Sequence, residues 1–228
     1  MNNTNNIKVD FTTTDNVTVK LNQTDITNLF HVVNYNSLVW QRTTWFGHKI
    51  FKCPMDMWIY QEILFELKPD FIIETGTLFG GSAWYYAHLF DIIGKGKVIT
   101  IDIDKKPDQP QHPRIEYING SSVDMKIFNK VKKMISGAKS VMVILDSDHS
   151  MKHVYEEMQL WNKLVTVGNY MIVEDSNING HPVLPNFGPG PMEAIDKYFE
   201  TEDDFIIDSD KEKFLLTQNP RGYLKKVK

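Results

Sequence analysis

The sequence contains a single cysteine, Cys53, and therefore cannot form a disulfide within the chain. Proteins without disulfides are typical of reducing compartments, so we expect a cytoplasmic location. No apolar run approaches the roughly 20 residues that a membrane-spanning helix needs. Residues 1–6 have neither the basic nor the apolar region of a signal peptide. We therefore expect no membrane span and no secretion signal.

A strong excess of charge is also missing. The formal net charge of −4 offers no general attraction for nucleic acid or for an anionic membrane. The few basic residues near the C-terminus are typical of a solvated tail. With 42% hydrophobic and 12% aromatic residues, the chain has the composition of a globular protein with a sizeable core. We therefore expect no nucleic-acid partner.

Three segments can be distinguished along the chain. Residues 1–35 form an arm rich in Asn, Thr and Asp, in which Ile7–Phe11 and Val17–Leu21 alternate as two short strands. The alternative is a loosely ordered arm that packs on a neighbouring subunit. Residues 36–68 form a cap segment whose helix starts at Pro54 and ends before Pro69. Residues 69–228 carry the main domain.

Residues 69–228 alternate between apolar strands and helical segments. Strands are expected at residues 70–75, 97–102, 114–118, 139–145 and 170–173. Helices are expected at residues 82–93, 123–135, 154–165 and 192–200, and a closing hairpin at 205–208 and 214–217. Such alternation is typical of a parallel sheet with helices on both faces. We predict an α/β fold with a Rossmann-like, doubly wound, mostly parallel sheet of seven strands and an N-terminal extension.

A glycine-rich turn follows the first of these strands, in the run Glu74-Thr75-Gly76-Thr77-Leu78-Phe79-Gly80-Gly81-Ser82. Glycine has no Cβ, so a ligand can approach the backbone closely at the helix N-terminus. Asp102 ends the second strand, where an acid can accept hydrogen bonds from both hydroxyls of a ribose. Ser121 and Ser122 follow the third strand, where an adenine would lie. Together these positions indicate a nucleoside cofactor.

Other readings of this region stay open. The turn could be only a tight connection, and Asp102 could cap the next helix. An NAD enzyme would use an acid at the same position, but the glycine spacing is not that of G-x-G-x-x-G.

Three acids follow two later strands of the predicted sheet. Asp146 comes directly after one strand, and Glu174 and Asp175 come after the next. Neighbouring parallel strands bring these ends together, and carboxylates repel each other unless a cation joins them. Oxygen ligands suit Mg²⁺, so we predict a metal site of Asp146, Glu174 and Asp175. Helix capping or surface ion pairing is the alternative, and Asp148 could replace Asp146.

Histidines near these acids are candidates for proton transfer. His149 lies three residues beyond Asp146, and histidine is the usual general base near neutral pH. His181, in the Gly/Pro-rich segment, is a second choice. His149 and His153 also have the i, i+4 spacing of a zinc-binding pair, but the carboxylates already account for a site.

Several blocks of the sequence resemble the cephalosporin hydroxylase/rhamnosyl O-methyltransferase family, over about residues 38–220. The blocks include Lys52-Cys53-Pro54, Glu74-Thr75-Gly76, Leu145-Asp146-Ser147-Asp148-His149 and Glu174-Asp175-Ser176-Asn177-Ile178-Asn179-Gly180-His181. The resemblance implies a class I methyltransferase fold, with S-adenosylmethionine (SAM) and Mg²⁺ as cofactors. It further implies O-methylation of a sugar or glycan hydroxyl. Relatives tend to associate, which implies a homo-oligomer.

The resemblance, together with a more distant one to catechol O-methyltransferase, also implies roles for single residues. SAM contacts fall on Glu74, Gly76, Thr77, Gly80, Ser82, Asp102, Ser121, Ser122 and Asp146. The base of related macrolide-sugar methyltransferases falls on His149, which favours a sugar over a catechol. An iron oxygenase and a catalytically silent SAM-binding module stay open as alternatives. The sequence shows no set of two histidines and one carboxylate of the kind that holds iron in oxygenases, which argues against that alternative.

Overall fold

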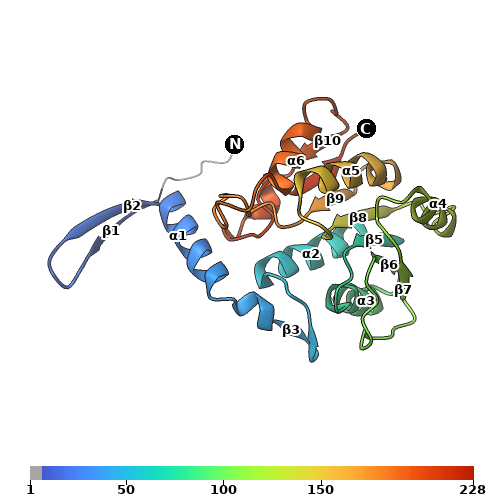
Figure 1. The fold of residues 1–228 in the computed structure, drawn as a ribbon. Coiled ribbons are helices and arrows are strands. Elements are labelled where there is room, and N and C mark those ends of the chain that lie inside the picture. Colours follow the sequence, from blue (N-terminus) through green and yellow to red (C-terminus); the bar gives the residue numbers. More distant parts are fainter. Residues whose placement is uncertain (1–6) are drawn as a thin grey trace.

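The computed structural model describes residues 7–228, in which a seven-stranded sheet is flanked by helices and preceded by a projecting hairpin (Figure 1). The strand order is β10-β11-β9-β8-β5-β6-β7. Strands β5 to β9 run parallel, whereas β11 lies antiparallel to both β9 and β10. The predicted mostly parallel, Rossmann-like sheet is confirmed. Residues 1–6, on which the expectation of no secretion signal depends, lie outside the described residues.

The elements of the main domain lie close to their predicted positions. Its strands are β5 (Phe71–Thr75), β6 (Lys97–Asp102), β7 (Ile115–Asn119), β8 (Val141–Leu145), β9 (Tyr170–Val173), β10 (Phe205–Ile207) and β11 (Tyr223–Lys226). Its helices are α3 (Gly81–Ile93), α4 (Met125–Met134), α5 (Met151–Trp161) and α6 (Pro191–Tyr198), with short 3-10 helices η2 (Asn162–Leu164) and η3 (Ser209–Glu212). None of the helices within residues 7–228 combines the length and apolar character needed to cross a bilayer.

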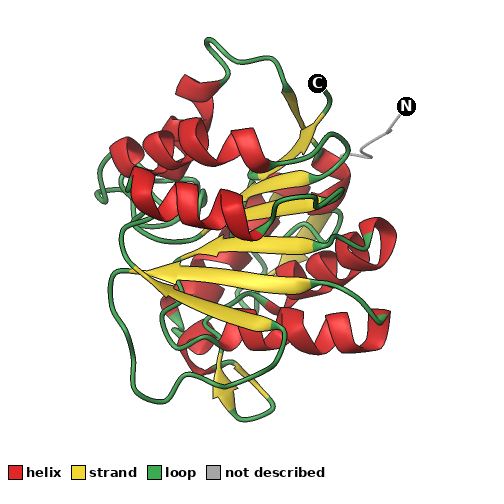
Figure 2. Cartoon of the chain, turned by 90° about the vertical axis from the view of Figure 1, so that its right-hand side faces the viewer, coloured by secondary structure: helices red, strands yellow, loops and turns green. Residues whose placement is uncertain are grey.

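Helices cover both faces of the sheet (Figure 2). Successive residues of a strand point to opposite faces, so β5 contributes Ile72 to one apolar core and Ile73 to another. The first core lies under α2 (Pro54–Leu67) and α3, and the second lies under α4, α5 and α6. A strand buried on both faces must be apolar throughout, which explains the uninterrupted run Val141–Leu145.

The order of the strands reverses at β5, because β6 lies on one side of it and β8 on the other. In doubly wound sheets, ligands bind outside the carboxyl ends of the strands at this point. Here the ends of β5 and β8 approach closely: Asp146 N donates to Thr75 O at 3.0 Å. Gly76 adopts φ +88°, and a Cβ on it would lie 1.7 Å from Asp146 O. The glycine therefore permits the contact between the two strand ends.

The N-terminal arm contains the two predicted strands, β1 (Lys8–Thr12) and β2 (Thr18–Asn22), which pair antiparallel. It also contains a helix that was not predicted, α1 (Gln23–Asn36). Its sequence signal is a capping box, in which the side chains of Asn22 and Asp25 accept from each other's backbone N–H at 2.9 and 3.2 Å. The buried His31 ties α1 to Asn177, in the loop after β9, at 2.9 Å.

Residues 36–68 contain η1 (Val39–Arg42), the short strands β3 (Thr44–Trp45) and β4 (His48–Lys49), and helix α2. As predicted, α2 begins at Pro54, whose missing N–H costs nothing in the first turn. It ends where Lys68 adopts a left-handed conformation before Pro69. The buried face of α2 joins the core under α3, so this segment is packed against the sheet.

The predicted closing hairpin is wrong in its second strand. Strand β10 lies where expected, but it pairs with β11 and not with residues 214–217. Those residues form a loop in which Thr217 Oγ1 and Gln218 N donate to the buried Asp56 carboxylate, at 2.5 and 2.8 Å. The loop is thus bound to Asp56 on α2. Phe214 and Leu215 are exposed and do not enter the sheet.

The Gly/Pro-rich loop between β9 and α6 is fastened by the carboxylate of Glu193. This carboxylate accepts from Asn179 Nδ2 at 3.0 Å and from Gly190 N at 2.7 Å, and it pairs with His181 Nε2 at 2.9 Å. Burial alone would raise the pKa of Glu193, but these contacts outweigh it and lower the pKa to about 2. The ionised carboxylate therefore holds the loop against the start of α6.

The close approach of Gly76 to Asp146 O predicts a large cost for Gly76→Ala. Gly168 has the same φ of +88° with nothing near its Cβ position, so Gly168→Ala is a matched control. The control should lose about 1 kcal/mol of unfolding free energy through backbone strain alone. Gly76→Ala should lose about 3 kcal/mol more through overlap. Denaturant unfolding measures both, and equal losses would contradict the steric argument.

The Glu193 contacts predict a dependence of stability on pH. A carboxylate whose pKa falls from 4.5 to about 2 on folding stabilises the folded state above pH 4.5. That contribution disappears as the pH falls toward about 2. We expect about 1–3 kcal/mol, allowing for partial exposure of the side chain. In Glu193→Gln, the unfolding free energy should change less with pH between about pH 2 and pH 4.5. Denaturant titrations at several pH values measure this. Glu156→Gln is the control, and the same slope in both variants would refute the assignment.

Candidate active site

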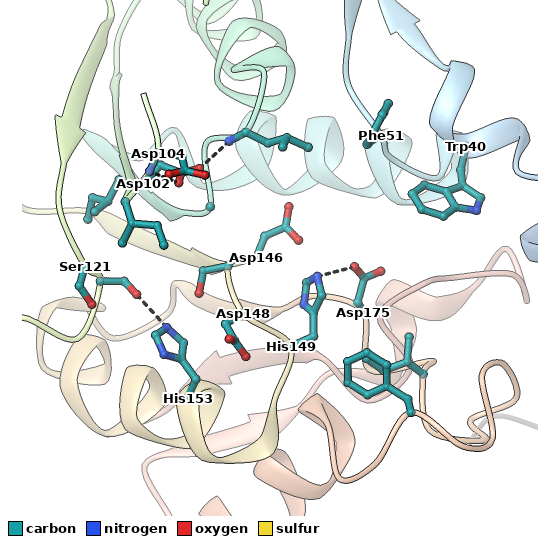
Figure 3. Close-up of a pocket in the computed structure, with 18 of the residues that line it drawn as sticks. Trp40, Phe51, Asp102, Asp104, Ser121, Asp146, Asp148, His149, His153 and Asp175 are labelled. Carbon is teal, nitrogen blue, oxygen red and sulfur yellow. Dashed lines mark hydrogen bonds and ion pairs between the residues drawn. The ribbon is translucent and has the colours of Figure 1, made fainter. Parts of the chain in front are cut away.

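A cavity of about 680 Å³ opens at the carboxyl ends of the strands, at the point where the strand order reverses. Figure 3 shows Asp102, Asp104 and Ser121 at one end and Trp40 and Phe51 at the other. Acidic residues and His149 lie between them. The cavity therefore has a polar end, an aromatic end and an ionisable middle.

The polar end is built by the loops after β6 and β7. The Asp102 carboxylate accepts from Leu78 N and from Asp104 N, both at 2.8 Å, which fixes its direction beside the glycine-rich turn. A carboxylate has about four acceptor positions, so two are left for a ligand. Ser121 and Ser122 line the same end, and Ser122 Oγ lies 3.1 Å from His153 Nε2.

The remaining residues of the glycine-rich turn lie at different depths. Gly76 lines the cavity, while Thr77 and Ser82 line a smaller adjoining recess. Glu74 is fully buried behind them and accepts from Thr100 Oγ1 at 2.6 Å. Burial raises the pKa of Glu74 to about 7. Gly80 caps α3 in a left-handed conformation. Glu74 and Gly80 line neither space, so they support the turn from behind.

Two of the three predicted metal ligands come together in the middle of the cavity. Asp146, His149 and Asp175 each offer an atom within 4.8 Å of the other two, the one such group of His, Cys, Asp or Glu among residues 7–228. His149 Nε2 lies 3.2 Å from Asp175 Oδ2 (Figure 3). Burial raises the pKa of Asp175, although the charge of His149 acts to lower it. The two carboxylates offer the oxygen ligands that a hard divalent cation prefers, and the imidazole of His149 lies beside them.

Glu174 does not join this group. Its carboxylate accepts from Tyr60 OH at 2.9 Å and from Lys52 Nζ at 2.5 Å, and Lys52 Nζ also contacts Asp146 Oδ2. Burial, reinforced by the charge of Asp146, raises the pKa of Glu174 to about 7. Burial alone would lower the pKa of Lys52, but the two carboxylates raise it overall. The role of Glu174 as a metal ligand stays a prediction that this arrangement does not support.

The other histidines and acids have separate partners. His153 contacts Ser122 and Glu157, so it does not form a zinc pair with His149. His181 is bound to Glu193 in the loop, away from the cavity lining. Asp148 lines the cavity, but its carboxylate caps Ser150 N at 2.7 Å.

The aromatic end comes from the residues that precede the main domain. Tyr35 and Trp40 stack with ring centroids 5.4 Å apart, and Trp40 meets Phe51 edge to face. Trp45 packs on α3 and Trp58 is exposed, so neither belongs to the aromatic end of the cavity.

The sequence analysis assigned no site role to Lys52 or Tyr60, although Lys52 lies in one of the blocks that carry the family resemblance. Both lie far along the chain from Glu174, and neither belongs to a motif with a chemical meaning of its own. Only the packing of α2 against the sheet brings them there.

Comparison with known proteins agrees with this architecture. The family model Rhamnosyl O-methyltransferase/CmcI matches residues 37–227. A rhamnosyl O-methyltransferase of Mycobacterium tuberculosis is 45% identical over 202 residues, covering 86% of this chain and 82% of that protein. The corresponding protein of Mycobacterium leprae is 44% identical over 201 residues, covering 86% and 88%.

Solved structures of CmcI share the fold. A CmcI apo-structure has a TM-score of 0.65 at 25% identity, covering 82% of this chain and 77% of that one. A CmcI structure with Mg and SAM has a TM-score of 0.64 at 24% identity, covering 82% and 78%. The match over residues 37–227 and the 45% identity lead to one conclusion. This chain belongs to the Rhamnosyl O-methyltransferase/CmcI family.

Proposed function

We propose that this protein is a SAM-dependent, Mg²⁺-dependent O-methyltransferase that acts on a sugar hydroxyl. One observation carries the proposal: the group of Asp146, His149 and Asp175 lies in the same cavity as Asp102 and Ser121. The candidate nucleoside site and the candidate metal site therefore open onto one space. Curated relatives at 45% identity are rhamnosyl O-methyltransferases, which supports a sugar, and specifically a deoxy-sugar, as the acceptor.

The cavity suits SAM in its size and in its polar groups. A volume of about 680 Å³ lies within the range of cofactor sites in proteins. The Asp102 carboxylate would accept hydrogen bonds from the ribose hydroxyls at its free acceptor positions. Ser121 and Ser122 would lie beside the adenine. Bound SAM would supply a sulfonium methyl group, an electrophile that needs little further activation.

The middle of the cavity suits a divalent cation. Asp146 and Asp175 would hold Mg²⁺ through carboxylate oxygens, with His149 beside them. A bound Mg²⁺ would lower the pKa of an acceptor hydroxyl and orient it.

His149 would accept the proton of the acceptor hydroxyl. Its Nε2 lies 3.2 Å from Asp175, whose carboxylate would stabilise the imidazolium that forms. The deprotonated acceptor oxygen would take the methyl group of SAM, and the sulfur would leave as a neutral thioether. Trp40 and Phe51 would form the wall against which the sugar is placed. Such positioning supplies much of the rate enhancement in group transfer.

Further predictions about this protein remain proposals. The single cysteine, which is buried, fits a cytoplasmic location. We also retain the proposal that the protein forms a homo-oligomer. The same holds for the division of the chain into an arm (residues 1–35), a cap segment (36–68) and a main domain (69–228). Among residues 7–228, the one group of His, Cys, Asp or Glu that could hold a metal contains one histidine and two carboxylates, which is not the set of two histidines and one carboxylate of an iron oxygenase.

The proposed metal site predicts the effect of Asp146→Asn, which removes a charge with little change of shape. We expect this variant to lose Mg²⁺-dependent methyl transfer to a rhamnosyl acceptor while it still binds SAM in calorimetry. Asp148→Asn is the comparison, because Asp148 also lines the cavity. Full activity of Asp146→Asn in excess chelator would refute the metal role. Loss of activity only in Asp148→Asn would identify Asp148, and not Asp146, as the metal ligand.

The proposed base predicts a different effect for His149→Gln. Removal of a general base should lower kcat by about 10²- to 10⁴-fold, since the proton then has no nearby acceptor. Binding of SAM and of Mn²⁺ should persist. A variant with normal kcat but weakened Mn²⁺ binding would show that His149 is a metal ligand instead.

A further inference from the structure

The hairpin of β1 and β2 has one apolar face that is open to solvent. Val9 and Phe11 of β1 lie opposite Leu21 and Val19 of β2, and opposite residues of an antiparallel pair share a face. Val9, Phe11 and Val19 are 41, 59 and 38% exposed. The other face is polar throughout and consists of Lys8, Asp10, Thr12, Thr18, Lys20 and Asn22. Strict alternation of this kind is typical of strands that bury one face, so the hairpin has the pattern of a surface that makes a contact.

The hairpin also lacks the support that a small sheet needs. Figure 1 shows it projecting beyond the body of the molecule, to which α1 connects it. Every residue of β1 and every residue of β2 except Leu21 is exposed. A two-stranded hairpin by itself is marginally stable in water, whereas three or more strands with an apolar face are stable together. The addition of strands would therefore stabilise it.

Helix α1, which follows the hairpin, is likewise apolar on its solvent side. Leu29, Phe30 and Val33 lie on one side of the helix and are 59, 50 and 58% exposed. The buried His31 lies on the other side, toward the body of the molecule. Asp25 is the one acidic or basic residue among the 14 of α1. A surface with so little charge has no attraction for nucleic acid or an anionic membrane, and it suits a neutral, apolar partner.

The outer edge of β1 is available for a further strand. Thr13 N donates to Val17 O at 2.9 Å, just beyond the paired residues Thr12 and Thr18. Hydrogen-bonded pairs alternate along an antiparallel ladder, so the odd-numbered residues of β1 bond to β2. The backbone groups of the even-numbered residues therefore point away from β2. Such an edge is a template for another strand.

Charge selects a second copy of β1 as that strand. When two copies of β1 pair antiparallel about Val9, Lys8 of each copy lies opposite Asp10 of the other. Val9 then lies opposite Val9, and Ile7 opposite Phe11. Opposite charges and apolar pairs across strands both stabilise a sheet. An axis shifted to Asp10 would place like charges together, and β2, which holds a lysine and no acid, offers no such match.

We propose that this protein associates through its N-terminal hairpin, with β1 paired antiparallel to β1 of a second copy. The two hairpins then form one four-stranded sheet with a continuous apolar face. A two-fold axis closes the contact after two copies, because the same edge of each copy meets the other. The hairpin precedes residues 37–227, which the family model matches. The inference goes beyond the proposed methyl transfer, no step of which depends on it.

Lys8→Glu tests the charge match, because it sets two acids opposite each other at both ends of the contact. Like charges across strands are destabilising, so the dissociation constant should rise about tenfold or more. Thr18→Glu is the matched control, since it adds an acid to the same polar face but on β2, away from the outer edge of β1. It should associate like the wild type. Sedimentation equilibrium of the full chain over a range of concentrations, without SAM or metal, measures the constants.

A charge-inverted variant that combines Lys8→Asp, Asp10→Lys and Lys20→Asp distinguishes this pairing from a general effect of charge. It keeps opposite charges at positions 10 and 20 within the hairpin, and at positions 8 and 10 between two copies of the variant. We expect it to self-associate like the wild type. It should not form mixed dimers with labelled wild type, because like charges then meet at both positions. Fluorescence energy transfer between labelled copies measures the mixing.

Three results would overturn the inference: a wild type that is monomeric at every concentration, an unchanged dissociation constant in Lys8→Glu, or free mixing of the inverted variant with the wild type. A monomer that sediments with phosphatidylcholine vesicles would also overturn it and would assign the apolar face to a membrane surface. None of these results bears on the proposed methyl transfer, since association is measured without SAM or metal. Loss of the proposed methyl transfer would in turn leave this inference intact.

Discussion

The ammonium group of Lys52 lies between the carboxylates of Asp146 and Glu174, and this contact allows acidic residues to gather at the ends of β8 and β9. Carboxylates buried side by side repel one another and lose hydration. A single cation placed between them offsets both costs. The cavity side then keeps Asp146 with His149 and Asp175.

The segment before the main domain is therefore part of the site. It supplies Lys52 to the acidic group and Tyr35, Trp40 and Phe51 to the aromatic end of the cavity. Helix α2 is the mechanical link, because its buried face joins the core under the sheet. The buried Asp56 on the same helix binds the loop before β11, which also carries Asn219. Packing of α2 thus aligns residues from both ends of the chain behind the cavity.

Much of the fold could be predicted because its signals are local. Apolar strands, amphipathic helices and Pro54 leave periodic or positional patterns, and the sheet topology follows from their alternation. The capping box of Asn22 and Asp25 was also present in the sequence, so α1 could have been identified. The closing hairpin could not be resolved, since Phe214–Thr217 is as apolar as a strand. Its true role depends on Asp56, which lies more than 150 residues earlier.

The sequence by itself determined that Asp102, Asp146 and Asp175 lie along one edge of the sheet, because parallel strands place their carboxyl ends together. It could not determine which side chains at that edge face the cavity. Glu174 and Asp175 are adjacent carboxylates that look equivalent in the sequence, yet one turns toward Lys52 and Tyr60 and the other toward His149. Only the tertiary structure decided this, because the partners of Glu174 lie 122 and 114 residues away along the chain. Contacts over such separations depend on how helices pack, and packing leaves no local pattern in the sequence.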